Sequence, residues 1–150
     1  MTTCCSNRSR CKSRTRPFGS AAKAGRPCAA PPALGDAWYP IGSNNRHLLD
    51  TLPRYRAGVA RLRRFTSEAG RDPESVALTY RIKRYGEALP DKASDGERRL
   101  FSGSTADIIG DLRALRDLGV SAVDIDFERP DPDASLAEMR RFKETVRARL

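Results

Sequence analysis

From Leu34 to the C-terminus, the sequence alternates three times between a strand-like and a helix-like segment. The strand-like segments are rich in apolar, β-branched and aromatic residues and span Asp36–Pro40, Ser75–Lys83 and Val120–Phe127. Apolar residues at three- and four-residue steps mark a helix after each strand. Strands that alternate with helices are typical of parallel βα units, which occur in doubly wound sheets and in (β/α)8 barrels. The pattern therefore predicts an α/β fold.

Capping residues and glycines mark the expected ends of the first two helices. The first helix is expected to begin at Thr51, and Pro53 lies in its first turn, where a missing N–H costs nothing. Gly70 ends this helix. Ser104 caps the second helix, which Gly119 ends. A polar loop is expected between them, after the second strand.

The last helix is expected to begin at Ser135. Ser135 and Glu138 have the S-x-x-E spacing of a capping box, in which each side chain bonds the other residue's backbone N–H. An apolar stripe follows along one face of this helix, formed by Leu136, Met139, Phe142 and Val146.

The third strand gives a hint of a barrel. Val123, Ile125 and Phe127 alternate with small or acidic residues, so this strand carries acids on the face opposite its apolar one. A complete (β/α)8 barrel needs roughly 250 residues, and residues 34–150 supply three βα units. A small three-stranded α/β domain would explain the periodicity equally well.

Residues 1–33 differ in character from the rest of the chain. They hold seven of the 28 Lys and Arg residues, all four cysteines and none of the 19 Asp and Glu residues. Because they show no apolar period, burial cannot offset the entropy of ordering them. We expect a disordered basic segment at 1–33 and a folded domain at 34–150.

The composition of this basic segment bears on several functions that such a segment could have. Phosphate contacts by its cations would suit nucleic acid, but Phe18 is its one aromatic residue, which disfavours base stacking. The cysteines do not form paired C-x-x-C motifs, so no metal site is expected. A secretory signal and a membrane span are not expected either, because no apolar run is long enough. With no cysteine after Cys28, a cytoplasmic location is predicted.

Two stretches carry a resemblance to a known family. "LGDAWYPIGSN" and "FSGSTADIIGDLRALRDLGVSAVDIDF" resemble the C-terminal part of the bacterial luciferase-like monooxygenases, particularly the members that use the deazaflavin coenzyme F-420. In that family a strand ending in a "GDGW"-like motif precedes a long helix. The likeness covers Leu34 to Leu150, and Ala37 departs from it, since glycine is usual there.

Members of this family carry a stretch like "PkPvQkPhPPIWVGG" just before that strand, and a shifted reading frame restores it here. Each shifted codon takes the third base of one residue and the first two of the next. Cys4 followed by Cys5 then permits only Leu, and Cys11 followed by Lys12 permits only Gln or a stop. With permitted third bases, "CKSRTRPFGSAA" becomes "QKPHPPIWVGG". One extra nucleotide near codon 33 would therefore explain residues 1–33 as an out-of-frame translation.

The resemblance implies an oxidoreductase that passes hydride between coenzyme F-420, or FMN in relatives, and a small organic substrate. In such a barrel the chemistry lies at the C-terminal ends of the strands. Cations there suit an anionic cofactor tail. The residues expected to bind the cofactor are Trp38, Tyr39, Gly42, Arg81 and Lys83, with Pro40, Ile41, Arg84, Asp126, Glu128 and Arg129 as further candidates.

Each of these charged residues also has a simpler interpretation as a solvated loop residue. His47, the only histidine, has the right chemistry for an acid or base, but the family motif gives no reason to assign it that role. No catalytic residue is identified.

With three of eight βα units, the chain as written is expected to bind no cofactor and to be inactive. Its open strand edges are expected to make it prone to self-association. The alternative is a small α/β module whose basic arm binds nucleic acid.

Overall fold

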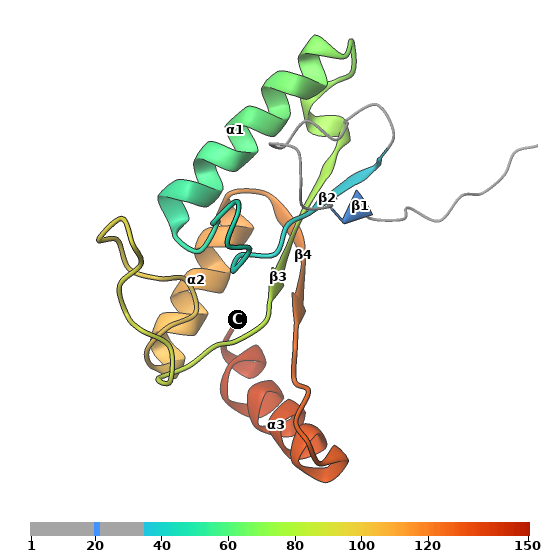
Figure 1. Ribbon diagram of the computed structural model, residues 1–150. Helices are drawn as coiled ribbons and strands as arrows, with labels where there is room; N and C mark the ends of the chain where they lie inside the picture. The colour runs from blue at the N-terminus through green and yellow to red at the C-terminus, as the bar shows by residue number, and fades with distance from the viewer. Residues whose placement is uncertain (1–19, 22–34) are drawn as a thin grey trace, which may run out of the picture.

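The structure of the chain is a computed structural model that describes Ser20–Ala21 and residues 35–150 (Figure 1). The expectation of a disordered segment therefore falls almost entirely outside the described residues. At Ser20–Ala21 the backbone forms a two-residue strand, which differs from that expectation at these two positions.

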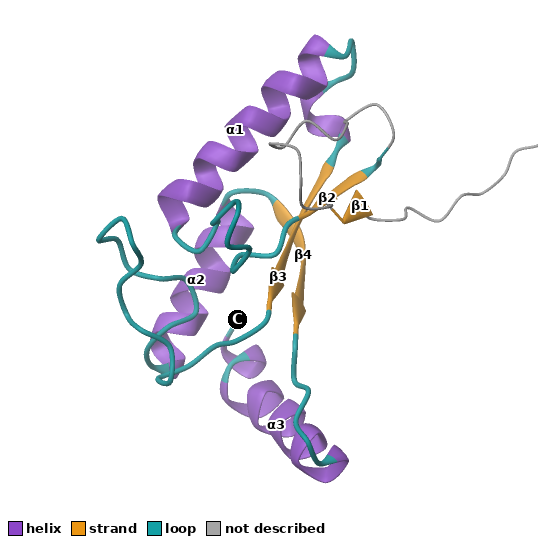
Figure 2. Cartoon of the chain, in the orientation of Figure 1, coloured by secondary structure: helices purple, strands orange, loops and turns teal. Residues whose placement is uncertain are grey.

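A parallel sheet forms the centre of the fold. Its strands are β1 (Ser20–Ala21), β2 (Ala37–Tyr39), β3 (Ala77–Ile82) and β4 (Val120–Ile125), in the order β1-β2-β3-β4 (Figure 2). Every neighbouring pair is parallel. The prediction that three consecutive strands are parallel neighbours is confirmed, and so is the α/β class.

Within residues 35–150, three helices accompany the sheet: α1 (Leu52–Glu68), α2 (Thr105–Asp117) and α3 (Pro132–Thr145). Figure 1 shows α1 and α2 on one side of the sheet, while α3 lies beyond the ends at which β3 and β4 terminate. Short 3-10 turns at Pro73–Ser75 and Arg147–Arg149 complete the elements. No helix among the described residues has both the length and the apolar character that crossing a membrane requires.

The first two helices begin where the sequence predicts. The Thr51 side chain accepts a hydrogen bond from the Arg54 backbone N–H at the start of α1. At α2 the Ser104 and Asp107 side chains each bond the other residue's backbone N–H, which makes a complete capping box. Gly119 ends α2 with a φ of 88°, a backbone angle that glycine adopts without strain.

The expected start of the last helix at Ser135 is wrong. Asp131 caps α3 by accepting from the Ala134 N–H, and Pro132 occupies the first turn. Asp131 and Pro132 form a stronger start signal, since an acidic cap and a proline both suit the N-terminus. Ser135 lies inside the helix, where its hydroxyl donates to the Asp131 carbonyl and accepts from the Arg129 N–H.

The core lies between the sheet and helices α1 and α2. Four aromatic side chains form a continuous row through it: Trp38, Tyr55, Tyr80 and Phe101, with successive ring centroids 5.2 to 5.7 Å apart. The apolar stripe expected along α1 contributes buried Tyr55, Val59 and Leu62. Aromatic pairs at this spacing add to the free energy gained by burial.

The two faces of the sheet differ in character. On β3, Leu78, Tyr80 and Ile82 are buried on the face toward α1 and α2. The other face carries Thr79 and Arg81, and register pairs them with Ala122 and Asp124 of β4. Since side chains alternate along a strand, polar and small residues share this second face. No described helix covers it (Figure 2).

The apolar stripe expected along α3 is only partly packed. Val146, just beyond the helix, is buried, and Phe142 packs against the core. Leu136 and Met139 remain 48% exposed. The packed face of α3 therefore runs through Phe142, and the other two apolar residues point elsewhere.

Candidate functional site

The C-terminal ends of β2 and β3 surround a hollow of about 360 Å³, which we call the strand-end hollow. It lies at the edge of a parallel sheet where ligands generally bind, because the loops that follow the strands converge there. Its wall comes from the turn after β2, the end of β3 and the loop before α2, and includes Gly42, Ser43, Asn45, Arg81, Lys83, Arg84, Arg99 and Phe101.

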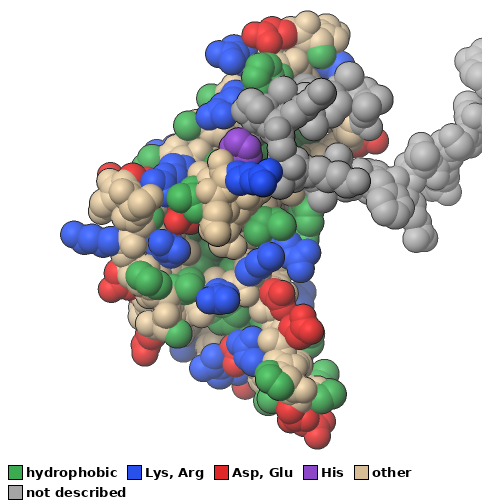
Figure 3. Space-filling view, viewed as in Figure 1, with side chains coloured by type: hydrophobic (Ala, Val, Ile, Leu, Met, Phe, Trp, Pro, Cys, Tyr) green, Lys and Arg blue, Asp and Glu red, His purple; other side chains and the backbone are tan. Residues whose placement is uncertain are grey.

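The strand-end hollow is rich in positive charge. Arg81, Lys83, Arg84 and Arg99 line it with one carboxylate, that of Asp50. Figure 3 shows Lys and Arg side chains in a band across the middle of the molecule. Arg99 is paired with Asp50, and Arg81 with two carboxylates on the open face of the sheet. Lys83 and Arg84 make no ion pair with another described residue, so they leave an excess of positive charge that favours an anionic group such as a phosphate or carboxylate.

Asp50 is buried and is neutralised by two arginines. Its carboxylate lies 2.6 Å from Arg54 and 3.6 Å from Arg99. The carbonyl of Asp50 also accepts from the Leu100 N–H at 2.8 Å. Asp50 thus ties the loop that carries Arg99 to the start of α1, so Arg99 is held at the wall of the hollow.

Gly42 has a packing role in this wall. A Cβ at this position would lie 1.9 Å from the Tyr80 hydroxyl oxygen. That hydroxyl donates to the Leu49 carbonyl at 2.7 Å, and the Gly42 carbonyl accepts from the Leu49 N–H. Glycine is therefore required here because Tyr80 passes directly against the backbone.

The open face of the sheet carries a polar network centred on Arg81. Its guanidinium lies 3.7 Å from Asp124 and 3.9 Å from Asp126, and the Tyr39 hydroxyl donates to Asp124. Burial, together with the hydrogen bond to Asp124, raises the pKa of Tyr39. The Arg81 Nε is buried and lacks a hydrogen-bond partner among the described residues.

Arg81 therefore belongs to both the network and the strand-end hollow. The two carboxylates fix its position without covering the whole guanidinium. An arginine held in this way is a good ligand for an anion, because less side-chain freedom is lost on binding. The structure thus brings three of the residues expected from the sequence to the hollow, Gly42, Arg81 and Lys83, while Tyr39 is linked to Arg81 through Asp124.

Trp38 lies on the other face of the sheet. It is 8% exposed, stacks on Tyr55 with the ring centroids 5.5 Å apart, and packs in the core. Since Trp38 and Tyr39 are adjacent in a strand, they point to opposite faces. The structure does not bring Trp38 to the strand-end hollow.

The remaining candidates are dispersed. Pro40 is buried, and Ile41 forms a bridge with Arg81. Glu128 is exposed, and Arg129 lies 3.8 Å from Glu138 of α3. His47 lines a different hollow of about 330 Å³, beside α1.

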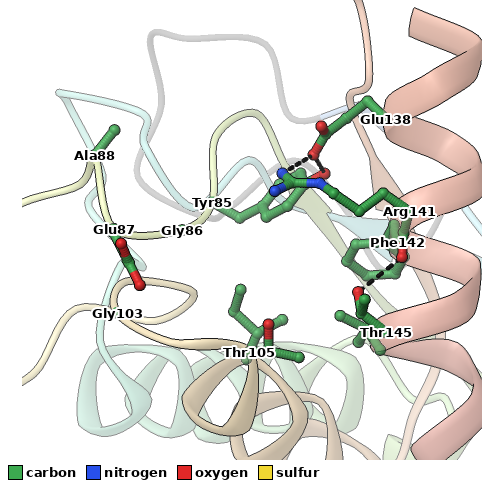
Figure 4. Close-up of a pocket in the computed structure, with 12 residues that line it drawn as sticks. Tyr85, Gly86, Glu87, Ala88, Gly103, Thr105, Glu138, Arg141, Phe142 and Thr145 are labelled. Carbon is green, nitrogen blue, oxygen red and sulfur yellow. Dashed lines mark hydrogen bonds and ion pairs between the residues drawn. The ribbon is translucent and has the colours of Figure 1, made fainter.

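A further hollow of about 370 Å³ lies between the loop after β3, the start of α2 and α3 (Figure 4). The Tyr85 hydroxyl donates to Glu138, which also accepts from Arg141 at 2.7 Å. The Tyr85 ring packs edge-on against Phe142, with the centroids 5.4 Å apart. Arg141, with help from Tyr85, holds the pKa of Glu138 below its ordinary value. The polar groups of Tyr85, Glu138 and Arg141 satisfy one another. These contacts hold α3 against the loop after β3.

Sequence reasoning missed Asp50, Arg99 and Phe101 at the strand-end hollow. They lie in loop segments whose composition is that of an ordinary polar loop, so nothing in it marks a functional site. Phe101 alone carried a signal, because a large apolar residue at the end of a polar loop is commonly buried.

Comparison with models of known protein families gave no match for this chain, and a search of curated proteins gave no significant match.

Proposed function

We propose that residues 34–150 are the last three βα units of a luciferase-like (β/α)8 barrel. In this proposal the intact enzyme passes hydride between coenzyme F-420 or FMN and a small organic substrate. The observation that carries the proposal is the cationic strand-end hollow at the C-terminal edge of a parallel sheet. The uncovered second face of that sheet also supports it, because in a barrel this face would line the interior.

The residues of the hollow fit the anionic tail of such a cofactor. Arg81 and Lys83 would hold a phosphate or carboxylate, with Arg84 and Arg99 close by on the wall. The bound deazaflavin or flavin would supply the hydride chemistry. Asp124 and Asp126 keep Arg81 oriented, while Tyr39 donates to Asp124.

The sheet described here would line part of a barrel interior, and closing the barrel needs further βα units. We propose that the DNA upstream of Leu34 encodes them in the shifted frame, together with the glycine loop in "QKPHPPIWVGG". The 150-residue chain is then expected to bind neither cofactor and to be inactive. Its uncovered sheet face favours self-association.

The test compares the present chain with a protein expressed from the restored reading frame. Binding of F-420 and FMN is measured by fluorescence titration. The restored protein should bind one of them with micromolar or better affinity, and Arg81→Ala should weaken binding roughly tenfold through loss of a charged contact. Arg64→Ala is the matched control, because Arg64 is exposed on α1 far from the hollow.

Two results would contradict the proposal. The first is a restored protein that folds but binds neither cofactor. The second is a 150-residue chain that binds the cofactor and turns over by itself.

A further inference from the structure

Helix α3 exposes an apolar pair that no described residue covers. Leu136 and Met139 are each 48% exposed and lie three residues apart, on neighbouring turns of one helix face. With Leu150 at the C-terminus, they are the exposed large hydrophobic residues of the described chain. In Figure 1, α3 projects beyond the sheet.

Two opposite charges flank this apolar pair on the same side of the helix. Asp133 precedes Leu136 by three residues, and Arg140 follows it by four. Asp133 and Arg140 are seven residues apart, which is close to two full turns. Both are exposed, and neither makes an ion pair with another described residue. At the lower end of the molecule, Figure 3 shows hydrophobic side chains beside acidic ones.

We propose that α3 is the contact surface for a second copy of this chain, packed antiparallel to α3 of the first. A two-fold axis midway between Leu136 and Met139 places Leu136 against Met139 of the second copy, and Met139 against Leu136 of the second copy. The same two-fold axis brings Asp133 of each copy within one helical turn of Arg140 of the other copy. The surface is therefore complementary to itself in polarity and charge.

Charge selects the antiparallel direction. A parallel arrangement would put Asp133 beside Asp133 and Arg140 beside Arg140, and like charges repel. It would also align the two helix dipoles, whereas antiparallel dipoles attract. Charge pairing of this kind decides orientation and partner more than it adds affinity. This inference does not depend on the proposed function, since it uses only residues of α3.

The contact is small, so the association is expected to be weak. Four apolar side chains, two from each copy, and two ion pairs bury far less than the roughly 1,200 Å² of a stable interface. We expect a dissociation constant on the order of 100 µM. The dimer is therefore expected at high protein concentration and not at low micromolar concentration.

Sedimentation equilibrium of the full chain tests this, with reductant present to prevent cross-linking through the cysteines. Leu136→Ser with Met139→Ser should weaken the association at least about tenfold through lost apolar burial. Leu150→Ser, at the other exposed leucine, is the control and should leave it unchanged. Circular dichroism of each variant should match the wild-type protein, because all three positions are exposed.

Charge reversal tests the antiparallel register. Asp133→Arg alone and Arg140→Asp alone should each weaken self-association roughly fivefold, because like charges then face one another. The variant with both changes should return to within about twofold of the wild-type protein. A mixture of the two single variants should associate, since one carries only cations at these positions and the other only anions.

The proposal is overturned if the wild-type chain stays monomeric up to 1 mM, a concentration roughly ten times the expected dissociation constant. It is equally overturned if the Leu136 and Met139 variant associates as the wild-type protein does. That result would place self-association on another surface, such as the open sheet face. If the double charge variant does not recover, the antiparallel register is wrong.

Discussion

The carboxylate of Asp111 in α2 accepts a hydrogen bond from the backbone N–H of Phe101 at 2.6 Å. Phe101 has a φ of 65°, a conformation that bulky residues rarely adopt, and its side chain is 1% exposed. Arg98 also bonds the Asp111 carboxylate. Asp111 therefore holds the end of the loop that forms one wall of the strand-end hollow, and the contacts it makes offset the strain at Phe101.

Replacing Asp111 is expected to destabilise the fold. Asp111→Ala leaves the buried Phe101 N–H without an acceptor, which should lower the free energy of unfolding by about 2–3 kcal/mol. Urea denaturation measures this change. Asp117→Ala is the matched control, because Asp117 is exposed on the same helix and should change stability by less than about 0.5 kcal/mol. Equal effects of the two changes would refute the role of Asp111.

Gly42→Ala is expected to be strongly destabilising. The added Cβ would collide with the Tyr80 hydroxyl, which is itself held by the Leu49 carbonyl. The clash should cost about 2–3 kcal/mol, since neither the buried ring nor the backbone has room to move. Gly110→Ala in α2 is the control, because a Cβ there meets nothing within 4 Å, and it should stabilise by about 0.5–1 kcal/mol. Thermal and urea unfolding of both variants should show opposite signs.

Thr51→Ala is expected to lower stability by about 1–2 kcal/mol. Thr51 is fully buried, and its hydroxyl accepts from the Arg54 N–H while donating to Asp95 at 3.1 Å. The change removes the cap of α1 and one tie to the loop before α2. Thr51→Ser keeps the hydroxyl and should lose less than half as much. If both variants lose equal stability, the methyl group and not the cap is responsible.

The Glu138 carboxylate predicts a pH dependence. Its pKa in the folded state lies below the ordinary value of 4.5, chiefly because Arg141 bonds the ionised form. A lowered folded pKa means that the stabilisation is present above pH 4.5 and is lost as the pH falls through the folded pKa. Glu138→Gln should therefore destabilise at pH 7, and its difference from the wild-type protein should shrink on acidification. Urea titrations between pH 7 and pH 3 follow this; a difference that stays constant would show that ionisation is irrelevant.

Much of the fold could be predicted from the sequence, because elements that bury one face in the core have apolar residues at recognisable positions. The β-branched and aromatic composition of β3 and the apolar stripe of α1 each reflect packing on the core, so these two elements were predicted within a few residues. Local chemistry also predicted the Ser104 cap of α2 and the start of α1 at Thr51, which the structure shows to be the cap of that helix. The start of α3 was predicted at Ser135, but the structure shows Asp131 as the cap and Pro132 as the first residue of that helix.

The site was less accessible, because it depends on contacts between distant segments. Arg81 and Lys83 were predicted from their place at a strand end, and the structure puts both at the hollow. Asp124 lies on the open face of β4 as the alternation predicts, but its bond with Tyr39 needs the strand order and register. Arg99 reaches the hollow only through its pairing with Asp50, which no local pattern reveals.

The sequence of the genomic DNA upstream of codon 34 tests directly whether residues 34–150 are the end of a luciferase-like barrel whose preceding part is read out of frame. The account predicts that, in the shifted frame, this DNA runs without stops and encodes "QKPHPPIWVGG" shortly before "LGDAWYP". One extra nucleotide near codon 33 should mark the change of frame. Stop codons in the shifted frame, or the absence of that motif, would contradict the claim that residues 34–150 belong to a luciferase-like barrel whose N-terminal part is read out of frame.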